Sequence, residues 1–396
     1  MRILFMVLRT KRSSHNATTL ASVTWTETRL GLEVAAGVRD FAHERGWRVL
    51  RLDNRAPLSP AVLKYNQVRG LVLQAFTDAP INAVLALGLP AVNVSNSRTN
   101  LKLPRVVPDD LRIGLLAADY YLGKGFRNFA FCGDRDSGAS ELRGRGFTER
   151  LNERGFPVER LDGKFGLTVA YLSQAKVSEL TRWLRHLRRP CALLAWNDGV
   201  CDTVVNICRH ERWRVPEEIS ILGVNNDFGR LIDNDAEAIS SIELPGRAIG
   251  REAARIVAGL IEGRALPREP LLIGPVRLVE RHSTDFYAVG DSAVAAALRF
   301  IRNNFQRPSA VDEVAGAAML SRRVLEKRFR ALLGFSPYAH ILRCRLERAK
   351  ELMLNTNLKL EEIAHLSGYG EGSNFSAFFS GKTGESPSEF RRRGQR

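Results

Sequence analysis

The first 285 residues alternate short apolar runs with longer amphipathic stretches. Short runs rich in β-branched residues predict strands, and a 3.6-residue apolar period predicts helices. The expected strands are 3–8, 47–52, 70–74, 91–95, 128–132, 192–196 and 219–224, and the expected helices are 30–44, 112–123, 140–154, 170–186 and 199–212. Strands that alternate with helices favour parallel sheets with helices on both faces. Two successive sets of such units predict an α/β region with two lobes.

The pattern changes at Asp291, after which only helical periods are found. Asp291 or Ser292 can cap the first helix of this region, and 286–290 is the expected joint. We therefore expect an α/β domain over 1–285 and an all-α domain over 291–396.

The helical region contains an internal repeat. Five positions recur 50 residues further along the chain: Leu325, Phe329, Gly334, Ser336 and Pro337 correspond to Phe375, Phe379, Gly384, Ser386 and Pro387. Each copy predicts a short helix, a tight turn and a second helix, which is helix-turn-helix geometry. Between the copies, 337–354 predicts one continuous helix with Leu342, Leu346, Ala349 and Met353 facing inward. A helix of this kind can hold two reading helices about one DNA turn, ~34 Å, apart.

Charge points towards a polyanionic partner. The chain of 396 residues has a formal net charge of +16 and a pI of about 10.1, which favours nucleic acid or an anionic membrane face. No apolar run approaches the ~18 residues of a spanning helix, and 3–8 is too short for a signal peptide. The five cysteines are scattered and form no C-x-x-C pair, as in a reducing compartment. We expect a cytoplasmic protein.

One face of the first predicted reading helix is basic. On a helical wheel Leu325, Phe329 and Leu332 form an apolar stripe, and the opposite positions are Arg323, Lys327 and Arg330. Arginine and lysine can donate to guanine and to phosphates in the major groove, and a glutamate such as Glu326 can accept from cytosine. Arg322 belongs to the same predicted DNA-binding set. The alternative is an ordinary solvated helix face, which the repeat and the basic excess disfavour.

The second reading helix is less charged. Its predicted DNA-facing residues are Gly372, Ser373, Asn374, Ser376 and Ala377. Asparagine can pair with adenine, and alanine can meet a thymine methyl group. Because this set lacks a cation, we expect a smaller and less salt-dependent contribution. The arginines of the tail, at 391–393 and 396, either add phosphate contacts or are solvated.

These residues resemble the signature of the AraC family of transcription regulators. The resemblance covers about 100 residues and rests on Glu361-Glu362-Ile363-Ala364, Ser367-Gly368-Tyr369, Asn374-Phe375-Ser376, Phe379, Gly384, Ser386-Pro387 and Phe390-Arg391. It implies two helix-turn-helix units that bind direct-repeat operators, usually as an activator beside RNA polymerase. Met319 stands where the first turn of the family commonly has glycine, and Ala377 where a longer polar residue is frequent.

The α/β region resembles the effector domain of LacI-type repressors, which is similar to periplasmic sugar-binding proteins. The motifs are Arg143-x-x-Gly146-Phe147, Ala195-Trp196-Asn197-Asp198, 215–220 and 222–226, and a weaker one joins Asp109 to Gly114. No DNA-binding helix precedes the first predicted strand. The order of sensor and output is similar to that of bacterial xylose operon regulators, whose sensor binds D-xylose between its lobes.

This resemblance implies ligand contacts by Arg143, Asn197 and Asn225, with Asp109, Asp198 and a stacking Trp196 as weaker candidates. Ligands of such α/β folds bind outside the carboxyl ends of strands, and Asn197 and Asn225 each follow a predicted strand. Asparagine, aspartate and arginine can pair with sugar hydroxyls. Asn225 stands where the family usually has aspartate. The alternatives are a surface position for Arg143, a core position for Trp196 and a helix cap for Asn197.

Enzyme motifs are absent from the sequence. Gly381-Lys382-Thr383 lacks the upstream glycine of a phosphate-binding loop, no dinucleotide fingerprint follows a strand, and there is no G-x-S-x-G turn. The seven histidines show no ligand-like spacing. We expect no catalytic residues, no cofactor and no metal.

The sequence therefore predicts a cytoplasmic, homodimeric transcription regulator that is controlled by a small sugar. Its expected partners are operator DNA, RNA polymerase and the sugar, and its expected output is activation of xylose-like catabolic genes. A sugar-binding receptor without regulatory output is the alternative, but it would need an export signal and would leave the duplicated basic helices unexplained. An enzyme acting on nucleic acid is disfavoured because no catalytic constellation is found.

Overall fold

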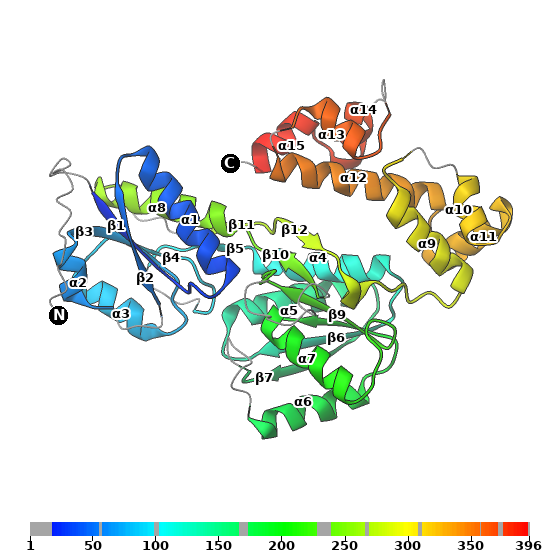
Figure 1. Cartoon of the computed structure of the whole chain (residues 1–396), viewed down its shortest axis with the longest axis horizontal. Helices are drawn as coiled ribbons and strands as arrows, with labels where there is room; N and C mark the ends of the chain where they lie inside the picture. The colour runs from blue at the N-terminus through cyan, green and yellow to red at the C-terminus, as the bar shows by residue number, and fades with distance from the viewer. Residues whose placement is uncertain are drawn as a thin grey trace, which may run out of the picture. The chain divides into compact units, whose positions relative to one another are not determined.

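The computed structural model (Figure 1) describes residues 18–54, 58–98, 103–165, 173–227, 239–265, 269–307, 311–356, 358–370 and 375–394. The predicted strand 3–8 and the start of the helix predicted at 170 lie outside these ranges. The chain divides into two units. Unit 1 comprises 1–108 and 245–273, and unit 2 comprises 109–244 and 274–396. The predicted domain limits 1–285 and 291–396 therefore stay a prediction.

Unit 1 is built on a four-stranded parallel sheet with the order β2-β1-β3-β4. Its strands are β1 (Thr19–Thr24), β2 (Arg48–Asp53), β3 (Val68–Leu73) and β4 (Ala91–Asn93). A separate parallel pair joins β5 (Val106–Pro108) to β11 (Leu271–Ile273). Strand β1 was not predicted from the sequence, because its Thr and Ser residues interrupt the apolar run although all six residues are buried.

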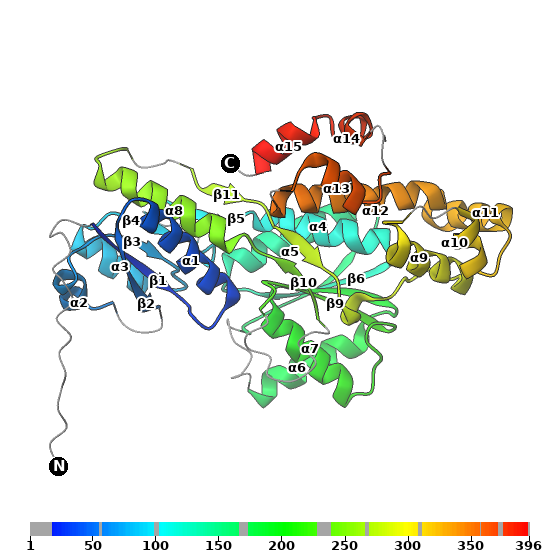
Figure 2. The same cartoon turned by 45° about the horizontal axis from the view of Figure 1, so that its top comes forward.

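Helices cover both faces of this sheet (Figures 1 and 2). One face carries α1 (Arg29–Glu44) and α8 (Gly246–Ile261), and the other carries α2 (Pro60–Tyr65) and α3 (Asp78–Leu87). The two helices of the first face pack with almost no space between their backbones. A Cβ atom built on Gly37 would lie 2.0 Å from the carbonyl oxygen of Arg247, and one on Gly250 would lie 2.0 Å from that of Val34. Only glycine permits this approach.

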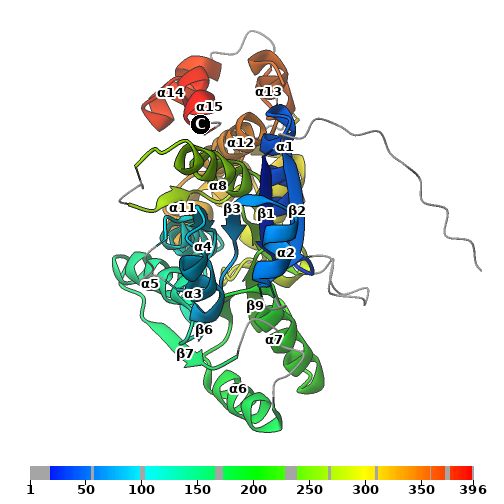
Figure 3. The same cartoon turned by 90° about the vertical axis from the view of Figure 1, so that its left-hand side faces the viewer.

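Unit 2 contains a six-stranded sheet with the order β12-β10-β9-β8-β6-β7, in which only the β10–β12 pair is antiparallel. The strands are β6 (Asn128–Asp134), β7 (Val158–Gly163), β8 (Cys191–Ala195), β9 (Ile219–Val224), β10 (Ser240–Glu243) and β12 (Arg277–Val279). Figure 3 shows α4 (Asp110–Gly123) and α5 (Gly138–Asn152) on one face, and α6 (Gln174–His186) and α7 (Asp198–His210) on the other. The 3₁₀ helix η3 (His282–Thr284) follows β12. The predicted class of parallel α/β sensor is confirmed.

The rest of unit 2 is helical in its described residues, as predicted. It comprises α9 (Ser292–Asn304), α10 (Val311–Ala317), α11 (Arg322–Leu333), α12 (Pro337–Asn355), α13 (Leu360–Leu366), α14 (Phe375–Thr383) and α15 (Pro387–Gly394). Two apolar cores share the long helix α12. Ile341 packs in the first core with α9 to α11, whereas Leu346, Ala349 and Met353 pack in the second with α13 to α15. Leu342, predicted to face inward, is half-buried.

The repeated motif has the same structural cause in both copies. Gly334 and Gly384 follow α11 and α14 with φ of 81° and 80°, the left-handed region that glycine adopts without steric cost. Ser336 then caps α12 by accepting from the Ala339 amide, and Ser386 accepts from the Glu389 amide at the start of α15. The following proline begins each helix, where its missing N–H is not needed. In each copy the glycine therefore ends one helix, and the Ser-Pro pair begins the next.

Candidate functional site

The position of Arg143 depends on a close crossing of α4 and α5. A Cβ atom on Gly114 would lie 2.1 Å from the carbonyl oxygen of Arg143, and one on Gly146 would lie 2.2 Å from that of Leu111. This crossing places the Arg143 side chain, only 4% exposed, against Asp110. Its Nε donates to Asp110 Oδ1 at 2.7 Å, and its Nη1 donates to the Trp196 carbonyl at 2.5 Å. Arg143 is thus buried at the end of β8, and the alternative of a surface position is wrong.

Asp109 and its neighbour have different roles. Asp109 caps α4 by accepting from the Arg112 amide at 3.1 Å. Asp110, which is 1% exposed, is the acid that meets Arg143. Sequence reasoning missed Asp110 because two adjacent acidic residues at the start of a helix are expected to cap the helix and to interact with its dipole. The hydrogen bond found for the Asp109 side chain is thus the helix cap, whereas Asp110 forms the ion pair with Arg143.

Trp196 and Asn197 directly follow β8. Trp196 is 4% exposed, and its indole Nε1 is buried without a hydrogen-bond partner in the described ranges. Buried polar groups in folded proteins nearly always have partners, so this N–H keeps the capacity to donate one hydrogen bond beyond those formed among the described residues. Asn197 caps α7, since its Oδ1 accepts from the Val200 amide at 2.9 Å. The alternative of a helix cap for Asn197 is therefore realised.

A strained turn follows β9. Asn225 and Asn226 have φ of 115° and 56°, a region that costs free energy for non-glycine residues and is often found at functional sites. The Asn225 Nδ2 donates to Asp227 Oδ2 at 3.3 Å, and the Asn226 amide donates to Ser241 Oγ at 2.9 Å. Asparagine tolerates this backbone better than most residues.

Asp198 holds this turn through two hydrogen bonds. Its Oδ2 accepts from the Asp227 amide at 2.8 Å, and its Oδ1 accepts from Ser241 Oγ at 2.7 Å. A Cβ atom on Gly223 would lie 2.1 Å from Asp198 Oδ1, so the contact requires glycine there. Burial, followed by the charge of Asp227, raises the pKa of Asp198 to about 7. Asp198 and Asn225 are thereby linked through Asp227.

Unit 1 presents a polar edge that sequence reasoning missed. The Trp25 amide donates to Gln74 Oε1 at 2.9 Å, and Asn54 Nδ2 donates to the Gln74 carbonyl at 2.8 Å. Asn54 Oδ1 is buried without a hydrogen-bond partner among the described residues. These residues directly follow β1, β2 and β3. Asn54 and Gln74 could have been found as polar residues at predicted strand ends, but Trp25 follows the strand that was not predicted.

The first reading helix, α11, presents the predicted basic face. Leu325 and Phe329 are fully buried, whereas Arg323, Lys327 and Arg330 are exposed and form no ion pair within the described part of the chain. Arg322 is exposed but its Nε lies 3.0 Å from Glu326 Oε1. Three cations of the predicted set therefore face solvent without an ion pair among the described residues, whereas Arg322 is paired with both Glu326 and Asp312.

The second reading helix is described only from Phe375. Ser376 and Ala377 are exposed on α14, whereas the predicted residues Gly372, Ser373 and Asn374 lie outside the described residues. In the tail, Arg391 donates to the Leu358 carbonyl at 2.7 Å. This contact ties α15 to the chain before α13.

Two further findings concern the described residues as a whole. None of the helices found there combines the length and the apolar character needed to cross a bilayer. Over the same ranges, no three His, Cys, Asp or Glu side chains lie close enough together to hold a metal ion.

Two protein families match the chain. A periplasmic binding protein-like domain matches residues 118–284, and a helix-turn-helix domain matches residues 314–393. The xylose operon regulatory protein of Escherichia coli (strain K12) is 29% identical over 332 residues, which cover 81% of this chain and 83% of the relative. That of Haemophilus influenzae is 27% identical over 292 residues and covers 73% of this chain and 74% of the relative.

Solved structures share the fold. The structure of the xylose-binding transcription activator xylR matches with a TM-score of 0.59 and 24% identity, covering 96% of this chain and 100% of that chain. A periplasmic binding protein/LacI transcriptional regulator from Alkaliphilus metalliredigens, complexed with D-xylulofuranose, matches with a TM-score of 0.54 and 17% identity over 68% of this chain and 99% of its own.

Proposed function

We propose that this chain, a transcription regulator similar over most of its length to xylose operon regulatory proteins, binds a pentose and activates transcription in response. D-xylose is the first candidate ligand, because the named relatives are regulators of xylose operons. The protein would act in the cytoplasm, as a homodimer on paired operator sites and beside RNA polymerase.

The coarser predictions are confirmed. The chain pairs a periplasmic-binding-protein-like sensor with a helix-turn-helix output, and its curated relatives are transcription regulators and not enzymes. The choice of sugar, the dimer, the contact with polymerase and the domain limits 1–285 and 291–396 are parts of the proposal.

The observation that carries the sugar proposal is the carboxyl edge of the unit 2 sheet. There the buried Trp196 has an unpartnered indole N–H among the described residues, beside the buried Arg143. Asn225 stands on a strained turn at the end of the neighbouring strand β9. An aromatic ring combined with amide, carboxylate and guanidinium groups suits a polyol, which offers both apolar C–H faces and paired hydroxyls. We propose Arg143, Trp196, Asn197 and Asn225 as ligand residues, with Asp198 as support for the turn and Asp109 as the weakest candidate.

The DNA proposal rests on α11. Its three exposed cations stand opposite a fully buried apolar stripe, the arrangement of a helix that enters the major groove. We propose Arg323, Lys327 and Arg330 as the main contacts, with Arg322 and Glu326 at the flank. Gly372, Ser373, Asn374, Ser376 and Ala377 are the proposed weaker contacts of the second copy.

Calorimetric titration of the full chain with D-xylose, D-ribose and L-arabinose tests this function, together with binding to a DNA duplex selected by the protein from a random library. We expect heat with one pentose and a change in DNA affinity on its addition. A panel of pentoses and hexoses that gives neither heat nor a change in DNA affinity would overturn the proposal.

Trp196→Phe provides the matched variant, because it keeps the buried ring and removes the indole N–H. One lost hydrogen bond should weaken pentose binding by roughly three- to tenfold. Trp183→Phe, on the outer helix α6, is the control and should leave the affinity unchanged. Equal affinities for the wild type and Trp196→Phe would remove Trp196 from the site.

A further inference from the structure

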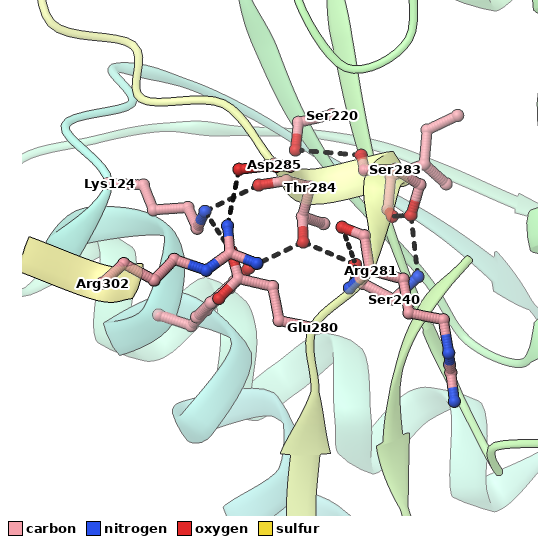
Figure 4. Close-up of polar contacts among 11 residues, drawn as sticks. Lys124, Ser220, Ser240, Glu280, Arg281, Ser283, Thr284, Asp285 and Arg302 are labelled. Carbon is pink, nitrogen blue, oxygen red and sulfur yellow. Dashed lines mark hydrogen bonds and ion pairs between the residues drawn. The ribbon is translucent and has the colours of Figure 1, made fainter. Parts of the chain in front are cut away.

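Four charged groups meet where the sensor lobe of unit 2 passes into the helical region (Figure 4). Glu280 forms ion pairs with Lys124, the residue after α4, and with Arg302 of α9, whose Nη1 lies 2.9 Å from Glu280 Oε1. Arg302 Nη1 also lies 2.5 Å from Asp285 Oδ1. Two cations and two anions thus form a neutral cluster, and one carboxylate is shared by a lobe residue and a residue of the first helix of the DNA-binding region.

Lys124 makes this cluster costly to take apart. Its side chain is 4% exposed, its Nζ donates to the Thr284 carbonyl at 2.7 Å, and it lies 4.5 Å from the ring centroid of Tyr287. Burial lowers the pKa of Lys124, and the carboxylate of Glu280 opposes that shift. A buried ammonium group that lost its carboxylate would be an uncompensated charge. The segment around Glu280 is therefore held firmly to the end of α4.

The side chain of the next residue, Arg281, lies on the opposite side of the chain from that of Glu280. Arg281 has an extended backbone, with φ of −140° and ψ of −165°, and successive side chains of an extended chain lie on opposite sides. Its Nη2 donates to Asn226 Oδ1 at 2.8 Å, and its Nη1 donates to the Ile239 carbonyl at 2.6 Å. Asn226 follows Asn225 in the strained turn. Glu280 and Arg281 thus connect the DNA-binding region to the proposed ligand edge within two residues.

Hydroxyl groups fix the same segment to the central strands. Ser283 Oγ donates to the Ile221 carbonyl of β9 at 2.6 Å, and Thr284 Oγ1 donates to Ser240 Oγ of β10 at 2.6 Å. The Arg281 amide donates to Ser240 Oγ at 2.7 Å. A shift of β9 or β10 must therefore be followed by residues 281–284, because these buried hydrogen bonds would otherwise be broken.

The other side of the cluster leads to the reading helix. Arg302 lies on α9. Two other residues of this helix, Leu298 and Ile301, pack in one apolar core with Leu325 and Phe329 of α11. Tyr287, which lies over the Lys124 ammonium group, belongs to the same core. A change in how α9 meets Glu280 would therefore reposition α11 as part of one packed body.

We propose that the segment 280–285 transmits ligand binding to the DNA-binding region, and that Glu280 is the positioning residue that holds α9 to the sensor lobe. This inference rests on the proposed function, since it takes the Asn225 turn as the ligand edge. A ligand shifts such an equilibrium only through different affinities for its two states.

The test measures coupling in the full chain. The quantity is the ratio of the dissociation constants for the selected DNA duplex without and with saturating D-xylose, or with the pentose that gives heat. Glu280→Gln keeps the shape and removes the charge. Arg302→Gln removes the ion pairs of α9 with Glu280 and Asp285 and leaves the buried Lys124–Glu280 pair intact. It therefore still tests the inference if Glu280→Gln does not fold. Glu211→Gln is the control, because Glu211 is an 18% exposed partner of Arg185 in the same lobe but outside this network.

Effective coupling corresponds to a ratio of roughly 5 to 150 in either direction. In the wild type and in Glu211→Gln we expect the pentose to change the DNA dissociation constant by this ratio. In Arg302→Gln and in folded Glu280→Gln we expect the pentose to change it by less than about twofold. Pentose affinity, measured without DNA, should stay within about twofold of the wild type. A purely structural role would lower the melting temperature and leave the ratio intact, which would overturn this inference alone. A wild type that binds no pentose, or whose ratio is one, would instead overturn the proposed function.

Discussion

Met319 and Gly368 occupy the same place in the two helix-turn-helix copies, and both have a left-handed backbone, with φ of 52° and 87°. Their surroundings differ. Met319 is 93% exposed, whereas a Cβ atom on Gly368 would lie 2.7 Å from the Phe305 carbonyl oxygen and 2.8 Å from that of Gln306. Space therefore requires glycine only in the second copy. The first copy can carry a side chain, at the cost of backbone strain.

Met319→Gly should raise the stability of the first copy slightly. The left-handed conformation costs a non-glycine residue roughly 1–2 kcal/mol in the folded state. Glycine avoids this cost, but its greater freedom in the unfolded chain lowers the free energy of unfolding by about 0.5–1 kcal/mol. The net gain is about 0–1.5 kcal/mol, or at most a few degrees in melting temperature. Gly368→Ala should lower the melting temperature, because the backbone at 305–306 must move. A lower melting temperature for Met319→Gly would mean that the methionine side chain makes a stabilising contact.

His340 should make the first copy sensitive to acid. It stacks on Phe335 with ring centroids 5.6 Å apart, and burial, followed by the charges of Arg343 and Lys124, lowers its pKa to about 4. Unfolded histidine binds a proton near pH 6.5 and the folded residue does not, so stability is present above pH 6.5 and is lost as the pH falls towards 4. The loss from pH 6.5 to 5 is about 2 kcal/mol.

His340→Phe checks this origin, because phenylalanine fits an aromatic neighbourhood and does not titrate. Denaturant unfolding at pH 7.5 and pH 5 should show the variant gaining stability relative to the wild type in acid. The same pH dependence in both proteins would assign the acid sensitivity to other groups.

At the scale of the element, α11 should supply most of the DNA affinity. Arg323→Ala and Lys327→Ala should each weaken binding to the selected duplex by ~1–3 kcal/mol, because both cations are exposed and unpaired within the described residues. If the lost contact is to a phosphate, the slope of log affinity against log salt should fall by about 0.9. Arg182→Ala, which removes an exposed cation from α6, is the control for net charge. Equal losses in all three variants would show a general charge effect and no groove contact.

The elements differ in how well the sequence predicted them. The strand predicted at 219–224 is β9 with the same limits, and the helix predicted at 30–44 is α1 with one more residue, because strong apolar periods define both. By contrast, β1 has three Thr or Ser residues within a fully buried strand, so no alternation marks it. The short strands β5, β11 and β12 are set by pairing partners far along the chain, which a local pattern does not contain.

The residues of the candidate site also differ in how well the sequence predicts them. Asn197 and Asn225 could be placed at strand ends because the strands before them are strongly apolar. Asp110 could not be distinguished from Asp109, since the choice depends on where α5 crosses α4 at Gly114 and Gly146. The Glu280 cluster was also invisible, because Lys124 and Arg302 are far from Glu280 along the chain and meet it only through the fold.

At the scale of the whole molecule, the proposed homodimer has a simple signature. One chain has a mass of 44.2 kDa. Light scattering after size exclusion should give twice that mass in the presence of the pentose, and the DNA complex should contain two chains per duplex. A complex with one chain per duplex would contradict the proposed dimer.

Unit 1 draws its parts from two separate stretches of the chain, 1–108 and 245–273. Its apolar layer of Leu20, Val34, Val38 and Val72 is closed by Ile249 and Val257 of α8. During synthesis the first stretch must therefore leave the ribosome and wait while 109–244 is made, with that layer open to water. A nascent chain arrested at residue 244 should expose this surface and recruit chaperones, whereas the released full-length chain should bury it beneath α8.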